Sequence, residues 1–136
     1  MNNKGFTLIE LLAVIVILAI IALIATPIIL NIINDARKGA RERSAEYVYE
    51  AVQLAYQTKV ALSNGEYPSL SDVETQISEN GLSNASISGD VITTKDKVEC
   101  TLSAPNGAIE ISCEFDGSPI WADADDAPEL GIMTVE

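Results

Sequence analysis

A long apolar run near the start of the chain constrains the fold more than any other feature of the sequence. Between Phe6 and Ile33 only five residues are not hydrophobic, and none of the five lies between Leu11 and Ala25. About twenty apolar residues are enough to cross the hydrocarbon core of a lipid bilayer. The run therefore predicts a transmembrane helix over residues 6–33.

The residues before this run suggest a cleavage site. A secretory signal peptide has a basic start, a short apolar stretch and then a small-residue cleavage site, so the apolar stretch is removed. Here the small residue with a basic neighbour, in the pair Lys4–Gly5, precedes the apolar run. A protease that cuts after Gly5 would leave the apolar segment on the mature protein.

The sequence Lys-Gly-Phe-Thr-Leu-Ile-Glu at residues 4–10 resembles the processing motif of type IV prepilins and of the related pseudopilins of type II secretion systems. The resemblance implies a leader peptide over residues 1–5, cleavage between Gly5 and Phe6, and methylation of the Phe6 amine by a prepilin peptidase/methyltransferase. It also implies that a membrane assembly machinery stacks the apolar helix with copies of this chain or with related pilins.

Glu10 is the single carboxylate in the apolar run. A charged side chain at the middle of a bilayer costs on the order of 3 kcal/mol, so Glu10 is a functional candidate. Cleavage would place the Phe6 amine four residues before it, about one helical turn away. The resemblance implies that Glu10 meets the Phe6 amine of a neighbouring subunit during assembly. The alternative is an acid at headgroup depth, where the helix dipole favours it.

Pro27 interrupts the run about two thirds of the way along. Proline removes a helical hydrogen bond and clashes with the preceding turn, at roughly 3 kcal/mol, although membrane helices tolerate it. The position resembles that of the helix-breaking proline of type IV pilins. Many relatives pair that proline with a glycine, and this run has none. We therefore expect a gentle kink at Pro27.

Four of the eight basic residues follow the run, at Arg37, Lys38, Arg41 and Arg43. Positive charge beside a membrane segment marks the cytoplasmic side, which alone would place the C-terminal domain in the cytoplasm. The resemblance implies the reverse: a single-pass plasma-membrane protein with a cytoplasmic leader, an extracytoplasmic domain and, after assembly, a place in a cell-surface filament. The basic residues would then anchor the chain at lipid headgroups or pair with neighbouring subunits.

The helix is expected to continue over residues 34–63 as an amphipathic half, with Gly65 as its C-terminal cap. Its predicted apolar stripe comprises Ala45, Val48, Val52, Ala55 and Leu62. A connection over residues 64–84 should hold a short helix, for which Ser71 to Glu74 has the spacing of a capping box.

Residues 85–136 are expected to form a small antiparallel sheet and an acidic C-terminal loop. Apolar residues alternate on both sides of Asn106–Gly107, and centring a hairpin there opposes four apolar pairs: Val98 with Phe115, Cys100 with Cys113, Leu102 with Ile111, and Ala104 with Ile109. The run 85–94 should supply one more strand. The predicted fold is α+β and pilin-like, with one long helix packed on this sheet.

This register predicts a disulfide between Cys100 and Cys113. Opposed residues in antiparallel strands have Cα atoms about 4.5 to 5.5 Å apart, which a disulfide accepts. The alternatives are two free thiols or a metal pair. Two cysteines without any histidine in the chain make a poor metal site, and an extracytoplasmic location favours oxidation.

The C-terminal region is strongly acidic. From Ser44 onward there are seventeen acidic residues and three lysines, which disfavours direct nucleic-acid binding. Asp123, Asp125 and Asp126 are candidate calcium ligands, because some pseudopilins that the chain resembles hold calcium in a C-terminal loop. EF-hand spacing is absent, and a solvated loop without any metal or cofactor is the alternative.

The sequence contains no histidine, nucleophile elbow or phosphate-binding loop, so we expect no enzyme. The main hypothesis is a structural subunit of a type IV pilus-like filament, polymerised through its apolar helix. The second is a pseudopilin of a type II secretion or competence machine. The third is a bitopic membrane protein that never polymerises and whose ectodomain binds a ligand.

Overall fold

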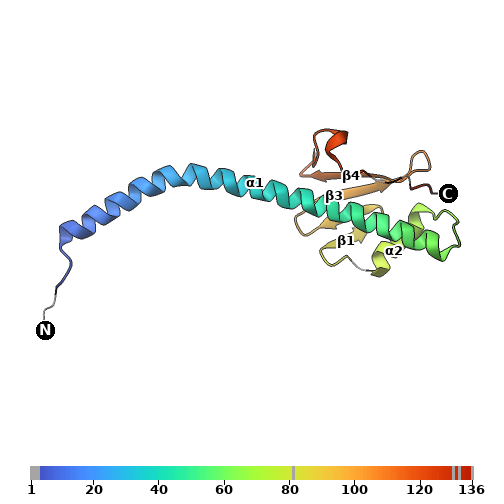
Figure 1. Cartoon of the computed structure of the whole chain (residues 1–136), viewed down its shortest axis with the longest axis horizontal. Coiled ribbons are helices and arrows are strands. Elements are labelled where there is room, and N and C mark those ends of the chain that lie inside the picture. The colour runs from blue at the N-terminus through green and yellow to red at the C-terminus, as the bar shows by residue number, and fades with distance from the viewer. Residues whose placement is uncertain (1–3, 81, 130, 132, 136) are drawn as a thin grey trace. The chain divides into compact units, whose positions relative to one another are not determined.

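The computed structural model describes residues 4–80, 82–129, 131 and 133–135, and the chain divides into two compact units, 1–38 and 39–136. A long helix, a short helix and a five-stranded sheet confirm the predicted α+β class (Figure 1). The elements are α1 (Leu8–Leu62), α2 (Leu70–Asn80), β1 (Ala85–Ser88), β2 (Val91–Thr94), β3 (Glu99–Ser103), β4 (Glu110–Phe115), β5 (Ser118–Pro119) and a 3-10 turn (Ala124–Asp126).

The second half of α1 buries one stripe of side chains. Four of the five predicted stripe residues are buried, and two tyrosines join them; the buried set is Ala45, Val48, Tyr49, Val52, Ala55 and Tyr56. The prediction for Leu62 was wrong, since its side chain is 71% exposed. Leu62 is the last residue of α1 and lies beyond Tyr56, the last buried residue of the stripe. Val60 packs against the core instead.

A left-handed turn ends α1. Asn64 has a φ of 57°, and the Gly65 N–H donates to the Val60 carbonyl at 3.0 Å. This six-to-one bond is the Schellman arrangement, in which the left-handed C′ residue is Asn64 and Gly65 follows it. The predicted stop is confirmed, but Asn64 takes the capping position that was expected for Gly65.

Ser69 and Asp72 form the capping box of α2. The Ser69 N–H donates to Asp72 Oδ2 at 3.0 Å, and the Asp72 N–H donates back to Ser69 Oγ at 3.3 Å. Hydrogen bonds from the Ser69 hydroxyl and N–H lower the pKa of the Asp72 carboxyl. The capping box expected at Ser71 was therefore placed two residues too late, because Pro68 fixes the chain just before Ser69 and the helix can begin at Leu70.

The five strands form an antiparallel meander in the order β1-β2-β3-β4-β5. The prediction of a single strand over residues 85–94 was wrong, because the chain turns at Gly89, whose φ is 62°, and pairs β1 with β2. A left-handed first residue is typical of the two-residue type II′ hairpin turn. β5 pairs with β4 across Asp116–Gly117, where both residues have positive φ, as the two-residue type I′ hairpin turn requires.

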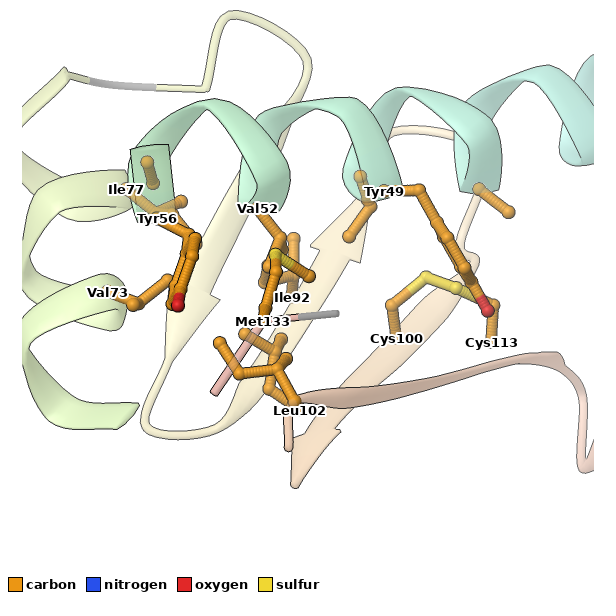
Figure 2. Packing of buried hydrophobic residues seen from close by; sticks show 14 of the residues in the cluster. Tyr49, Val52, Tyr56, Val73, Ile77, Ile92, Cys100, Leu102, Cys113 and Met133 are labelled. Atoms are coloured by element: carbon orange, nitrogen blue, oxygen red, sulfur yellow. A yellow bond between two sulfur atoms is a disulfide. The ribbon is translucent and has the colours of Figure 1, made fainter. Parts of the chain in front are cut away.

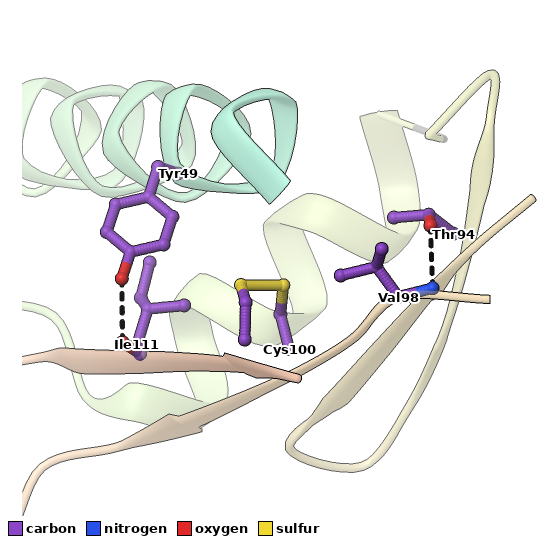
Figure 3. Close-up of a disulfide and its surroundings, with 6 residues drawn as sticks. Tyr49, Thr94, Val98, Cys100 and Ile111 are labelled. Carbon is purple, nitrogen blue, oxygen red and sulfur yellow. Dashed lines mark hydrogen bonds between the residues drawn. A yellow bond between two sulfur atoms is a disulfide. The ribbon is translucent and has the colours of Figure 1, made fainter. Parts of the chain in front are cut away.

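The register predicted between β3 and β4 is confirmed. Cys100 opposes Cys113, and Leu102 opposes Ile111. The two outermost predicted pairs lie outside the ladder. Val98 belongs to the turn before β3, where its N–H donates to Thr94 Oγ1 at 3.2 Å (Figure 3).

At the other end of the hairpin, the expected pair of Ala104 with Ile109 lies outside the ladder. Ile109 pairs with the C-terminal segment Met133–Val135 instead. The Ile109 N–H donates to the Met133 carbonyl at 2.9 Å, and the Val135 N–H donates to the Gly107 carbonyl at 2.8 Å. The Tyr56 hydroxyl donates to the Thr134 carbonyl at 2.9 Å. The end of the described chain is thus part of the folded domain and not only an acidic loop.

The core lies between α1, α2 and the sheet (Figure 2). Val52 of α1, Ile92 of β2 and Leu102 of β3 are among its fully buried side chains, and Met133 closes the cluster from the C-terminal segment. Val73 and Ile77 of α2 complete one side. The domain core therefore draws on α1, α2, the sheet and the C-terminal segment.

The Cys100–Cys113 disulfide joins the two central strands beneath Tyr49 (Figure 3). The Cys113 carbonyl accepts the Ile120 N–H at 3.0 Å on the side away from β3, so this pair exchanges no ladder hydrogen bonds. Opposed Cα atoms approach most closely at such positions. Here they are 4.0 Å apart, and neither thiol is free.

Replacing both cysteines with alanine should lower the free energy of unfolding of the domain by about 3 kcal/mol, because the bond closes a loop of moderate length in the unfolded chain. Urea titration of the full chain in detergent, followed by near-UV circular dichroism, measures the change. Ser103→Ala, at an exposed site of β3, is the control. A loss below about 1 kcal/mol would contradict this role.

Ser69→Ala should cost about 1 kcal/mol, the usual value for an N-cap serine, whereas Ser71→Ala should be nearly neutral. Because the pKa of Asp72 is lowered in the folded state, its contribution is present above the unfolded pKa near 4 and is lost as pH falls through the folded value. The difference between the two variants should therefore shrink in acid. Equal effects of both substitutions would refute the assignment of the cap.

Candidate functional site

The predicted cleavage site lies in a stretch without regular structure. Residues 4–7 precede α1, and Phe6 is 92% exposed. A Cβ added at Gly5 would meet nothing within 4 Å. The Gly5–Phe6 peptide bond thus lies outside the helix, in an exposed part of the described chain.

Glu10 is held by Thr7 at the start of α1. The Thr7 N–H and the Thr7 hydroxyl both donate to Glu10 Oε2, each at 2.9 Å, and the Glu10 N–H donates to Thr7 Oγ1 at 3.3 Å. This is a capping box with Thr7 as the N-cap residue. The reasoning from sequence missed it, although Thr-Leu-Ile-Glu before an apolar run has the required Thr-x-x-Glu spacing.

This geometry corrects one assumption about Glu10. The helix was expected to begin at Phe6, which would place the Phe6 amine one turn from the carboxylate along the same helix. Because α1 begins at Leu8, Phe6 lies outside it. Thr7 therefore supplies the donors that Glu10 accepts within its own chain.

In the described part of the chain, the apolar part of α1 is not buried. The helix contains a window long and apolar enough to cross a membrane, and none of that window is buried. The large side chains from Leu8 to Ile33 are 40% exposed or more. Such a surface requires a bilayer or apolar partners.

Pro27 lies inside continuous helix. One residue earlier, the Thr26 hydroxyl donates to the Ala22 carbonyl at 2.6 Å. Threonine bonds of this kind often bend helices, as does a proline in the following position. The helix thus persists through Pro27, and the gentle kink expected there stays a prediction.

The basic residues after the apolar run have different surroundings. The Arg41 guanidinium carbon lies 3.4 Å from the centroid of the Phe115 ring, a cation–π contact between α1 and β4. Arg43 lines an open hollow of about 430 Å³ with Lys95 and Asp96. One of the residues expected to anchor lipid or pair with neighbouring subunits therefore already contacts its own domain.

The candidate calcium ligands are exposed. Asp125 and Asp126 belong to the 3-10 turn, and Asp123 precedes it. Among the residues that the structure describes, no group of three or more His, Cys, Asp or Glu side chains is arranged to hold a metal ion. The geometry gives calcium no support, and calcium binding stays a prediction that a titration would test.

Comparison with known proteins bears on the N-terminal region. Residues 1–26 match the prokaryotic N-terminal methylation motif. The chain carries the leader signature of type IV pilins and pseudopilins. No curated protein and no solved structure matches the chain.

The leader signature relates the geometry of residues 4–10 to processing and membrane anchoring. It indicates a precursor of the pilin or pseudopilin type, processed by a prepilin peptidase. Together with the uncovered apolar helix it indicates anchoring in a membrane. The exposed Gly5–Phe6 bond and the capped Glu10 both lie within the matched residues.

Proposed function

We propose that this chain is a structural subunit of a type IV pilus-like filament. It would be made as a prepilin, cleaved after Gly5, methylated on the Phe6 amine and polymerised with copies of itself or related pilins through its apolar helix. The observation that carries the proposal is the methylation motif at residues 1–26, joined to a helix whose apolar window is not buried among the described residues.

The role proposed is structural and not enzymatic, and it requires no cofactor. In this arrangement the leader lies in the cytoplasm and the domain outside the plasma membrane, until an assembly machinery moves the subunit into the filament. The Cys100–Cys113 disulfide supports this orientation, because disulfides persist mainly in oxidising compartments.

The leader signature applies equally to pseudopilins, so a pseudopilin of a type II secretion or competence machine is the alternative within the same family. Electron microscopy of cells labelled with an antibody to the domain distinguishes them. Long labelled surface fibres indicate a pilus and confirm the outward orientation. A short structure confined to the envelope indicates a pseudopilin.

Mass spectrometry of the mature protein tests the proposed processing. The N-terminus should be Phe6 with a methylated amine, and Gly5→Val should leave the precursor uncleaved. Since a side chain at Gly5 would meet nothing within 4 Å, loss of cleavage in that variant would reflect recognition by the peptidase and not misfolding. An unprocessed wild-type chain would favour a bitopic membrane protein that never polymerises.

Glu10→Ala should leave cleavage intact and slow filament assembly about tenfold, the order expected for losing a polar contact between membrane helices. Sheared filaments, quantified against mature subunit in the cell, give the rate. Asn31→Ala, at another polar position of the same apolar run, is the matched control. Assembly of correctly processed Glu10→Ala at the native rate would remove Glu10 from the mechanism.

A further inference from the structure

The domain that follows Lys38 holds few positive charges, and two of them lie in one hollow. Residues 39–136 contain eighteen acidic and five basic residues, a net charge of −13. Arg43 of α1 and Lys95, just after β2, both line an open hollow of about 430 Å³, termed the basic hollow. Both side chains are exposed. The basic hollow is therefore a positive place on a strongly acidic domain.

The two cations of the basic hollow form no ion pair with an acid among the described residues. The Lys95 ammonium donates to Asn84 Oδ1, a neutral acceptor, at 3.0 Å. The Arg43 guanidinium has no hydrogen bond or ion pair within the described part of the chain. Asp96 also lines the hollow, and its carboxylate accepts the hydroxyl of Ser44. The basic hollow is thus able to bind carboxylates from outside the chain.

A second hollow, of about 290 Å³, lies between α1 and residues 126–129 and is termed the acidic hollow. Four exposed acids line it: Glu46, Glu50, Asp126 and Glu129. None of their carboxylates forms an ion pair or a hydrogen bond with another residue that the structure describes. Like charges gathered in this way repel one another, so the acidic hollow favours cations from outside the chain.

The two hollows lie on opposite flanks of α1. Ser44 lines the basic hollow, and Gln53 lines the acidic hollow. These residues are nine positions apart in the sequence. At 3.6 residues per turn, that separation is about 180° around the helix. One subunit therefore presents a positive flank and a negative flank in opposite directions.

We propose that the domains of neighbouring subunits dock through these hollows, so that the two cations of the basic hollow on one copy pair with carboxylates of the acidic hollow on the next. The inference rests on the proposed function and adds to it an interface between domains, separate from the apolar helix.

Charge and geometry both favour a second copy of this chain as the occupant. Domains of net charge −13 repel one another, so two copies approach best where cations meet acids. The two hollows are different patches of one protein, and a contact between different patches repeats from copy to copy. Such a contact produces a ring or an open helical filament, whereas a self-complementary patch produces a closed dimer.

Charge reversal tests this interface. In the first variant, Arg43→Glu and Lys95→Glu make both hollows acidic. In the second, both hollows become basic through Glu46→Lys, Glu50→Lys and Glu129→Lys. Each full chain is expressed in cells that assemble the wild-type filament, and sheared filament is divided by mature subunit, measured by mass spectrometry. Alone, each variant should give about tenfold less filament than the wild type.

Co-expression of the two variants should restore assembly, because each contact then joins an acidic hollow to a basic one. Mass spectrometry of the sheared filaments should find the two variants in about equal amounts, since they must alternate along the contact. Restoration would also show that both variants fold, as the exposed positions of their substitutions lead us to expect.

Matched control variants carry the same change in net charge elsewhere on the domain. Lys59→Glu with Lys97→Glu matches the first variant, and Glu66→Lys with Glu79→Lys and Glu99→Lys matches the second. None of these five residues lines either hollow. Both control variants should assemble to within about twofold of the wild type.

Native-level assembly of the first variant alone would overturn the inference. Equal losses in the matched controls would also overturn it, because they would show a general effect of charge. Losses that co-expression does not restore would overturn it too, and would leave the basic hollow to another anionic partner such as lipid headgroups. In these three cases the wild type still assembles and the proposed function stands. A wild-type chain that is cleaved but forms no filament would contradict the proposed function and this inference together.

Discussion

The whole structure depends on one helix, α1, whose first half exposes apolar side chains on every face and whose second half packs on the domain. From Leu8 to Ile33 the large side chains of α1 are all exposed, whereas between Ala45 and Tyr56 a single stripe is buried. A small sheet of short strands is marginal unless something covers its apolar face. The stripe on α1 supplies that cover, so the second half of α1 is part of the folded domain.

Two tyrosines on the buried stripe hold α1 against the rest of the domain through hydrogen bonds. The Tyr49 hydroxyl donates to the Ile111 carbonyl of β4 at 2.8 Å, and the Tyr56 hydroxyl donates to the Thr134 carbonyl. Burial raises the pKa of both phenols, so both remain protonated donors at neutral pH. Each ring thus fills the core while its polar end satisfies a backbone carbonyl, of β4 for Tyr49 and of the C-terminal segment for Tyr56.

Hydrophobic alternation was enough to predict the register of β3 and β4, because a slip by one residue would have opposed Cys100 and Leu102 to polar partners. The β5 hairpin was missed, although Asp116–Gly117 is a strong turn signal, because Ser118–Pro119 is too short to show alternation. The pairing of Met133–Val135 with the hairpin end depends on contacts distant in sequence, which no local pattern contains. At Glu10, the predicted importance came from the cost of a carboxylate in lipid, and the capping contact with Thr7 was found only in the structure.

The magnitudes indicate why one carboxylate can matter in a filament of apolar helices. Inside a bilayer, helix association gains no hydrophobic free energy, because lipid tails are as apolar as the side chains. The domains oppose association, since seventeen acids and three lysines follow from Ser44 onward; two like charges 10 Å apart in water repel by about 0.4 kcal/mol before salt screening. Close packing must outweigh this repulsion, but packing of similar aliphatic side chains specifies register poorly. In the proposed filament, a contact from Glu10 worth about 1–2 kcal/mol in lipid exceeds several such repulsions and exists at one register only.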